Sequence, residues 1–137
     1  MATSRIMTVH PIVELGAAQT VKRTVDYVTN PAKTDGGLLV TAFGCDPDCA
    51  AEDFMFSRDE YQQKTGRDQG ENEILIYHVR QSFLPGEADA ETVSRLGYEL
   101  AMELTGGEFS FIVCTHADKP HLHNHIVRPD RALFREN

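Results

Sequence analysis

Histidines crowd one short segment of this 137-residue chain, FSFIVCTHADKPHLHNHIV, at residues 109–127. Four of the six histidines lie there, and three of them recur at every second position: His121, His123 and His125. Successive side chains of a strand point to opposite faces, so these three share one face if the segment is extended. Neutral imidazole is the commonest protein ligand of transition metals. A histidine that serves only packing usually stands alone, so the spacing indicates a divalent-metal site.

The first half of the segment predicts how a fourth histidine joins the group. An apolar stretch that reads as a strand ends at His116, and a short polar turn with one proline leads into the second strand. If the two strands pair as a tight antiparallel hairpin, His116 comes to lie beside His123 and His125. We therefore predict His116, His123 and His125 as metal ligands, with His121 as an extra polar contact or a substitute ligand.

Asp118 lies in the turn between the two strands. A carboxylate close to a histidine ligand typically accepts a hydrogen bond from the second ring nitrogen and so fixes the tautomer of the ring. We expect Asp118 to support the metal site in this way.

Hydrophobic periodicity predicts the elements that must position these residues. Their order is β-α-β-α-β-α-β-β, which indicates an α+β fold with a single, mostly antiparallel sheet and helices packed against it. Residues 73–83 are partly apolar on both faces, so we expect this strand to be central. The predicted strands span residues 5–13, 38–43, 73–83, 109–116 and 121–127, and the predicted helices span residues 17–28, 46–65 and 89–104.

Apolar residues recur at helical spacing in the predicted helices. In the first helix, Val21, Val25 and Val28 form the stripe, and Tyr27 lies outside it, in the last turn before Asn30 and Pro31 stop the helix. In the second helix the apolar side is formed by Phe54, Phe56 and Tyr61. In the third helix four residues are expected to face the core: Val93, Leu96, Leu100 and Leu104.

Charge is distributed unevenly along the chain. The net charge is −8, which is unusual for a nucleic-acid-binding protein. Residues 35–60 carry seven acids against one base, and residues 83–108 carry six acids against one base. The other stretches hold every predicted site residue and together carry a charge of +3. We expect the acids on solvated outer faces of helices and a neutral to basic surface at the site, with modest, salt-dependent affinity for DNA.

Length and cysteine usage indicate a single intracellular domain. Hydrophobic residues make up 41% of the chain and charged residues 25%, as in ordinary globular domains. Three cysteines are an odd number, and the N-terminus lacks an apolar signal core, so we expect reduced thiols in a cytoplasmic protein. Cys45 and Cys49 lack two further ligands nearby, so they are interpreted as structural. No apolar run is long enough to span a membrane, and we expect no membrane partner.

The segment HADKPHLHNHIV resembles the third motif of the relaxases, the mobilization nucleases of plasmids and integrative conjugative elements. These enzymes belong to the endonuclease class with a His-hydrophobe-His motif. His116 corresponds to the first ligand of that motif and is followed by Asp118, while the closing pair is His123 and His125. The residue between the pair is Asn124, which departs from the family pattern.

Two further segments carry the resemblance. DYVTNPAKT, at residues 26–34, resembles the first relaxase motif, in which a tyrosine near a helix end is the nucleophile, and Tyr27 matches it. HVRQSF is similar to a family segment that contacts the DNA backbone, which implies this role for Arg80 and Ser82. The resemblance covers most of the chain and is specific at the histidine segment and at Tyr27. The further residues assigned to DNA contacts are Lys33, Lys119 and His121.

The resemblance implies a palm-like sheet and a metal-assisted transesterification. Tyr27 would attack a DNA phosphodiester and form a 5′-phosphotyrosine with a free 3′-hydroxyl, and the reverse step would rejoin the strand. The implied cofactor is Mg²⁺ or Mn²⁺, and the implied catalytic residues are Tyr27 and Asp118. Phenols ordinarily ionise with a pKa of about 10, so attack at neutral pH needs a nearby cation or base.

The expected substrate is single-stranded or hairpin DNA at an origin of transfer, with accessory and coupling proteins of conjugation as possible partners. Residues 1–137 would then be a relaxase catalytic core, either by itself or as a fragment of a longer protein. A rolling-circle replication initiator, a transposase of the same class, and a non-catalytic DNA-binding accessory protein with a structural metal remain alternatives. The letters His-Asn-His do not indicate an HNH nuclease, whose motif is dispersed along a ββα unit.

Overall fold

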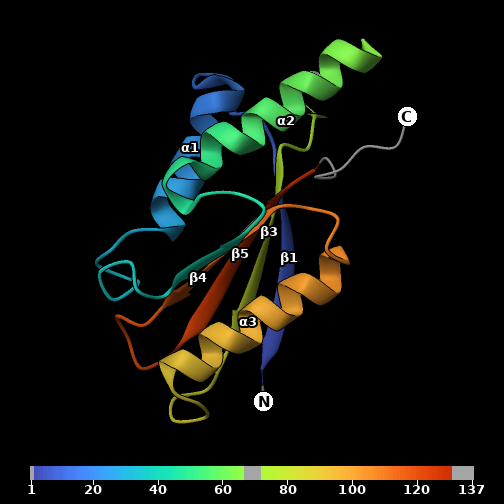
Figure 1. Ribbon diagram of the computed structural model, residues 1–137. Helices are drawn as coiled ribbons and strands as arrows, with labels where there is room; N and C mark the ends of the chain where they lie inside the picture. The colour runs from blue at the N-terminus through green and yellow to red at the C-terminus, as the bar shows by residue number, and fades with distance from the viewer. Residues whose placement is uncertain (1, 67–71, 131–137) are drawn as a thin grey trace.

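Five strands and three helices make up the fold in the computed structural model, which describes residues 2–66 and 72–130 (Figure 1). The predicted α+β order is confirmed, and every strand pairing in the described residues is antiparallel. The elements are β1 Thr3–Val9, α1 Gly16–Val28, β2 Val40–Phe43, the 3-10 turn η1 Pro47–Cys49, α2 Ala50–Thr65, β3 Ile76–Ser82, α3 Ala90–Thr105, β4 Phe111–His116 and β5 His123–Pro129.

The strand order in the sheet is β1-β3-β5-β4-β2. The prediction of a central strand at residues 73–83 is therefore only partly right, because β3 has a neighbour on each side but β5 lies at the centre. The tight hairpin is confirmed, since His116 on β4 pairs directly with His123 on β5. His121 precedes β5 instead of forming part of it.

Helices cover both faces of the sheet, with α1 and α2 on one face and α3 on the other (Figure 1). The predicted stripe of α1 is confirmed, because Val21, Val25 and Val28 are almost completely buried. They pack with Phe54 of α2 and with Ile112 of β4 in one hydrophobic cluster. Burial of this stripe holds the C-terminal end of α1 against the sheet and turns the neighbouring positions outward.

On the opposite face the predicted stripe of α3 is only partly right: Val93 is buried and Leu100 packs, half-buried, against the core. The buried positions of α3 are Val93, Gly97, Ala101 and Thr105, whereas Leu104 is 51% exposed. The helix is rotated by one position because small residues let it approach the sheet closely. A Cβ atom on Gly97 would lie 2.6 Å from Cγ of Asn124 and 2.9 Å from Cγ1 of Val113.

Local chemistry explains the other differences from the predicted boundaries. β1 ends at Val9, before Pro11, which has no N–H to donate to a ladder. The second helix opens with the 3-10 turn, where the Asp46 carboxylate accepts a hydrogen bond from the Asp48 amide at 2.9 Å. Phe56 was expected on the buried side of α2, but it is 68% exposed and does not belong to that side.

The three cysteines are free thiols. Burial raises the pKa of Cys45 and of Cys114 to about 12, which keeps both thiols protonated and unreactive at neutral pH. Among residues 2–66 and 72–130, no helix combines the length and the apolar character that a membrane span requires.

Candidate active site

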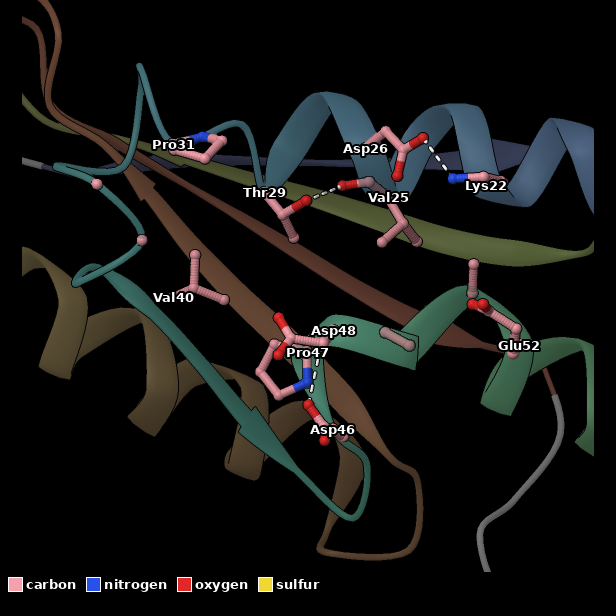
Figure 2. A pocket seen from close by; sticks show the side chains of 14 residues that line it. Lys22, Val25, Asp26, Thr29, Pro31, Val40, Asp46, Pro47, Asp48 and Glu52 are labelled. Atoms are coloured by element: carbon pink, nitrogen blue, oxygen red, sulfur yellow. Dashed lines mark hydrogen bonds and ion pairs between the residues drawn. The ribbon is translucent and has the colours of Figure 1, made fainter.

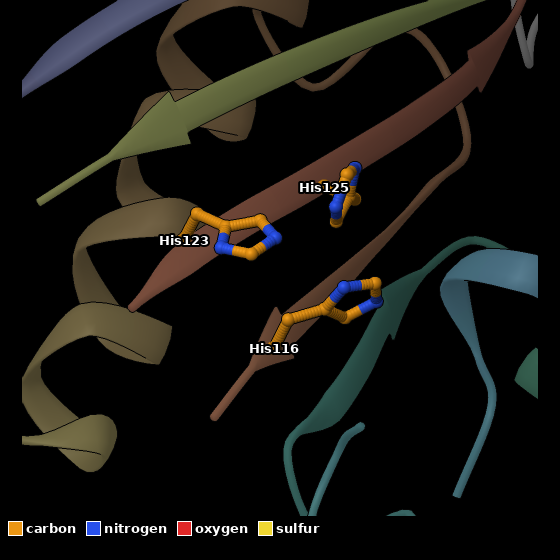
Figure 3. Close-up of side chains that lie close together, drawn as sticks. All are labelled: His116, His123 and His125. Carbon is orange, nitrogen blue, oxygen red and sulfur yellow. The ribbon is translucent and has the colours of Figure 1, made fainter. Parts of the chain in front are cut away.

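The β4–β5 hairpin brings three imidazoles together on the face of the sheet that α1 covers (Figure 3). The ring centroids of His116 and His125 are 4.2 Å apart, and His123 lies 5.1 Å from His116 and 4.9 Å from His125. Each ring offers one nitrogen, and the three nitrogens lie within 4.8 Å of one another. The site therefore presents three converging nitrogen donors.

Backbone carbonyls fix the tautomers of two of these rings. His116 Nε2 lies 3.0 Å from the carbonyl of Val28, and His123 Nδ1 lies 3.2 Å from the carbonyl of His121. A carbonyl only accepts hydrogen bonds, so each of these nitrogens carries the proton and the other nitrogen of each ring keeps a lone pair. Val28 is the last residue of α1, where carbonyls have no partner within the helix. The end of α1 thus orients His116.

The third ring, His125, is buried and has only one of its two nitrogens paired within residues 2–66 and 72–130. Its Nδ1 lies 2.6 Å from Nε2 of His78, while its Nε2 is buried without a hydrogen-bond partner in the described residues. A buried polar atom without a partner is costly in a folded protein. A metal ion bound at the three converging nitrogens would use this lone pair, so the donor set fits a divalent ion.

Burial also sets the protonation of the cluster. It lowers the pKa of His125 to about 2, with His116 and His78 adding like-charge repulsion. It lowers the pKa of His116 and of His123 below the ordinary value for histidine as well. Neutral imidazole is the form that binds metals, so the cluster needs to lose no protons to bind an ion at neutral pH.

Tyr27 lies beside this cluster although it comes from a distant part of the sequence. Its ring meets those of His116 and His125 edge-on, with centroids 5.7 Å and 5.9 Å apart. Its side chain is 52% exposed, because the buried stripe of α1 occupies the adjacent positions. The last turn of α1 thus places an accessible phenol next to the candidate metal ligands.

The other three tyrosines are turned away from the cluster. Tyr77 and Tyr98 lie on the α3 side of the sheet, where Tyr98 packs against a phenylalanine ring. Tyr77 is half-buried, and the guanidinium carbon of Arg128 lies 4.3 Å from the centroid of its ring. Tyr61 lies near the C-terminal end of α2, which is remote from the hairpin turn in Figure 1.

The prediction that Asp118 accepts a hydrogen bond from a ligand imidazole is wrong. In each of the three rings, the nitrogen that does not face the other two rings has another partner. The Asp118 carboxylate instead lies 3.4 Å from Nζ of Lys33. The backbone carbonyl of Lys33 accepts a hydrogen bond from the Ala117 amide at 2.8 Å, which fixes the loop after α1 against the hairpin turn. Lys33 Nζ also lies 5.8 Å from the centroid of the Tyr27 ring. This arrangement sets a cation beside the phenol.

The residues predicted to contact DNA surround the cluster. Arg80 and Ser82 on β3 pair directly with the two histidines of β5, so all four side chains share one face. Lys119 and His121 are exposed in the β4–β5 turn. The His121 ring is not part of the three-nitrogen group, and only its carbonyl contacts that group.

Arg5 on β1 is a further basic residue of this surface, and no sequence motif indicated it. It pairs directly with Arg80, and a groove of about 200 Å³ is lined by both arginines together with Thr3, Met7 and Ser82. No motif marks β1, and its alternation alone cannot reveal which residue of another strand lies opposite. The register across β1, β3 and β5 supplies this information.

A separate hollow of about 470 Å³ lies between α1 and the start of α2 (Figure 2). Its rim carries Asp26, Asp46, Asp48 and Glu52, and the nearby Lys22 is paired with Asp26 at 2.9 Å. A phosphate backbone would meet mostly like charge there. The arginine-lined side of the site carries the opposite sign of charge.

A five-stranded antiparallel sheet that carries three converging imidazoles, with a helix-borne tyrosine beside them, defines a nuclease domain of the His-hydrophobe-His class. Comparison with known proteins agrees with this class. Residues 27–129 match the family model described as "Relaxase: MobA/VirD2-like, nuclease domain", and the chain belongs to this family.

Curated relatives carry relaxase names. The "Group II intron-interrupted relaxase LtrB" of Lactococcus lactis subsp. cremoris is 30% identical over 127 residues, covering 79% of this chain and 23% of that protein. Two proteins named "Protein rlx" from Staphylococcus aureus are 36% and 33% identical over 114 residues, covering 83% of this chain and 32% of each relative. The chain thus spans about a quarter to a third of the length of these relatives.

Proposed function

We propose that this chain is the catalytic domain of a relaxase, which nicks and rejoins one DNA strand at an origin of transfer and so initiates conjugative transfer or mobilization. The observation that carries the proposal is the position of Tyr27, whose ring lies 5.7 Å and 5.9 Å from the rings of His116 and His125. Membership of the relaxase family supports it. The proposed location is the cytoplasm, where the DNA substrate lies, with accessory and coupling proteins of conjugation as proposed partners.

The proposed ligands of a single divalent ion are His116, His123 and His125. An ion held there would attract a non-bridging oxygen of the scissile phosphate, offset its charge and orient the phosphorus for in-line attack. All three donors are nitrogens, whereas Mg²⁺ prefers oxygen ligands. Of the two ions expected from the sequence, Mn²⁺ is therefore the better fit.

The proposed covalent step is a transesterification. The Tyr27 Oη–P bond forms while the bond between phosphorus and the 3′ oxygen breaks. The phenolic proton is released to solvent, and the leaving 3′ oxygen takes up a proton to become the free 3′-hydroxyl. The other strand end remains attached as a 5′-phosphotyrosine. This bond conserves the energy of the phosphodiester, so attack by a 3′-hydroxyl can restore the strand.

Lys33 and Asp118 are proposed to act together on the nucleophile. An ammonium close to a phenol stabilises the phenolate, which is the stronger nucleophile. The ion pair with Asp118, at 3.4 Å, restrains Lys33 near the Tyr27 ring. In this assignment Asp118 positions the lysine, which replaces the tautomer-fixing role predicted for it.

We propose that the substrate strand runs across β5, β3 and β1 on the side of the arginines. Arg5, Arg80 and His125 form one row across three strands, a span of roughly 10 Å. Two like charges directly opposite each other destabilise a strand pair. Neither Arg5 nor Arg80 has a carboxylate partner within residues 2–66 and 72–130. A DNA phosphate would supply the missing counter-charge.

The test is mass spectrometry of the protein after incubation with Mn²⁺ and single-stranded DNA that contains the origin of transfer. The wild-type protein is expected to form an adduct whose peptide map places the nucleotide on Tyr27. Tyr27→Phe should keep its fold and bind DNA and Mn²⁺ normally, yet form no adduct, because only the phenolic oxygen is lost. Tyr98→Phe on the opposite side of the sheet is the matched control and should react like the wild type.

Three outcomes would contradict the proposal. An adduct that persists in Tyr27→Phe on another residue would overturn the choice of nucleophile. Tight Mn²⁺ binding without nicking or an adduct on any DNA would instead favour an accessory protein with a structural metal. Nicking at an origin of replication but not at an origin of transfer would favour a replication initiator.

A further inference from the structure

His78 on β3 contacts the candidate metal cluster without belonging to it. The register places it on the same face of the sheet as His125, and its Nε2 lies 2.6 Å from Nδ1 of that ring. The ring centroids are 4.9 Å apart and the rings are inclined by 46°. One short hydrogen bond thus joins two imidazoles.

Only one proton can lie between these two nitrogens, and its position decides the tautomer of His125. If His78 Nε2 carries it, His125 must be protonated on Nε2, a buried atom without an acceptor in the described residues. If His125 Nδ1 carries it, His125 Nε2 keeps a free lone pair. The second arrangement avoids a buried, unpaired N–H group and is therefore favoured.

We propose that His78 is a positioning residue that accepts the Nδ1 proton of His125 and thereby directs the His125 Nε2 lone pair to the metal. The inference rests on the proposed metal site. It completes a pattern in that site: backbone carbonyls fix the tautomers of His116 and His123, and a side chain performs the same task for His125.

The topology explains why a side chain is needed here. His125 lies on the central strand, with β3 on one side and β4 on the other, and antiparallel ladders occupy the carbonyls of these strands. His116 can reach the carbonyl of a helix end, and His123 can reach the carbonyl of a turn residue. Next to His125, an acceptor must come from a side chain of the adjacent strand, and His78 on β3 supplies it.

The experiment compares His78→Gln with His78→Met in Mn²⁺ titrations followed by calorimetry. The two substituted side chains have similar length, but only glutamine offers an oxygen that can accept the His125 proton. His78→Met is expected to weaken Mn²⁺ binding by about 10- to 100-fold, the usual range for loss of such a partner, and His78→Gln should restore most of it. His10→Met is the control, because the His10 ring contacts Thr8 and the Glu73 carbonyl outside the cluster.

A second readout needs neither metal nor DNA. Long-range ¹⁵N–¹H correlation spectra of the metal-free protein should show His125 protonated at Nδ1 in the wild type and in His78→Gln, but as a mixture of tautomers in His78→Met. Wild-type Mn²⁺ affinity in His78→Met, or a His125 protonated at Nε2 in the wild type, would overturn the role of His78. A wild-type protein that binds no Mn²⁺ would contradict the metal site itself, while the spectra would still decide the hydrogen bond.

Discussion

Two buried polar clusters lie back to back across β5, and they differ in how completely their polar atoms are paired. On the α3 side, Asn124 accepts a hydrogen bond from the Thr115 hydroxyl at 2.6 Å. Its amide nitrogen donates to Gln81 Oε1 at 2.9 Å and to the Val93 carbonyl at 2.8 Å. On the other side, the adjacent residue His125 has one paired nitrogen and one buried, unpaired nitrogen.

The difference separates structure from function. A buried network whose members are all paired rigidifies a protein, and Asn124 in this way joins β5 to β4, β3 and α3. A buried polar atom that no described residue pairs needs a water or a bound ion as its partner, and the two imidazoles beside His125 make an ion the better candidate. Asn124 is the departure from the relaxase motif, and its side chain lies on the structural side of the strand. The neighbouring histidines keep the arrangement that the motif implies.

The largest effect is expected from removing the unpaired nitrogen. His125→Ala should abolish nicking and weaken Mn²⁺ binding by more than the roughly 100-fold associated with loss of an outer partner. Truncation of a buried ring leaves a cavity and lowers stability, so circular dichroism of the variant checks that it is folded. Calorimetry and a nicking assay measure both effects. His121→Ala is the control and should be milder, and equal damage from it would refute the ligand assignment.

A smaller effect is expected from Asn124, on the α3 side of β5, and it concerns stability instead of catalysis. Asn124→Leu should lower the free energy of unfolding by about 3 kcal/mol, because it leaves the buried Thr115 hydroxyl and Val93 carbonyl without their partner. Mn²⁺ affinity of the folded protein should change little. Urea unfolding followed by circular dichroism measures the change, with Thr115→Val as a milder variant. Normal stability combined with lost Mn²⁺ binding would show that Asn124 belongs to the site.

The smallest effect is expected at Arg5, on the edge strand β1 and on the same face of the sheet as the three histidines. Arg5→Ala should reduce the slope of log affinity against log salt concentration by about 0.7 for single-stranded DNA, which corresponds to one lost phosphate contact. Fluorescence anisotropy at several salt concentrations measures it. Arg95→Ala removes the same charge from α3, on the other side of the sheet, where Arg95 is paired with Glu99 at 2.9 Å. An equal change of slope in both variants would mean that only net charge matters.

The sequence by itself determined the features that depend on local periodicity. Alternation along a strand and a short turn suffice to place His116 beside His123 and His125, since neither requires knowledge of distant segments. The same holds for α1, where the spacing of valines buries one stripe and leaves Tyr27 exposed.

Only the tertiary structure decided which distant groups meet. The rotation of α3 follows from close packing at Gly97, which a stripe of leucines does not reveal. The contacts of Lys33 with Asp118 and of His78 with His125, and the pairing of Arg5 with Arg80, depend on loop paths and strand register. Each of these contacts joins residues that lie far apart in the chain. Because no short segment contains both partners, only the packing of the whole sheet sets the geometry of the contact.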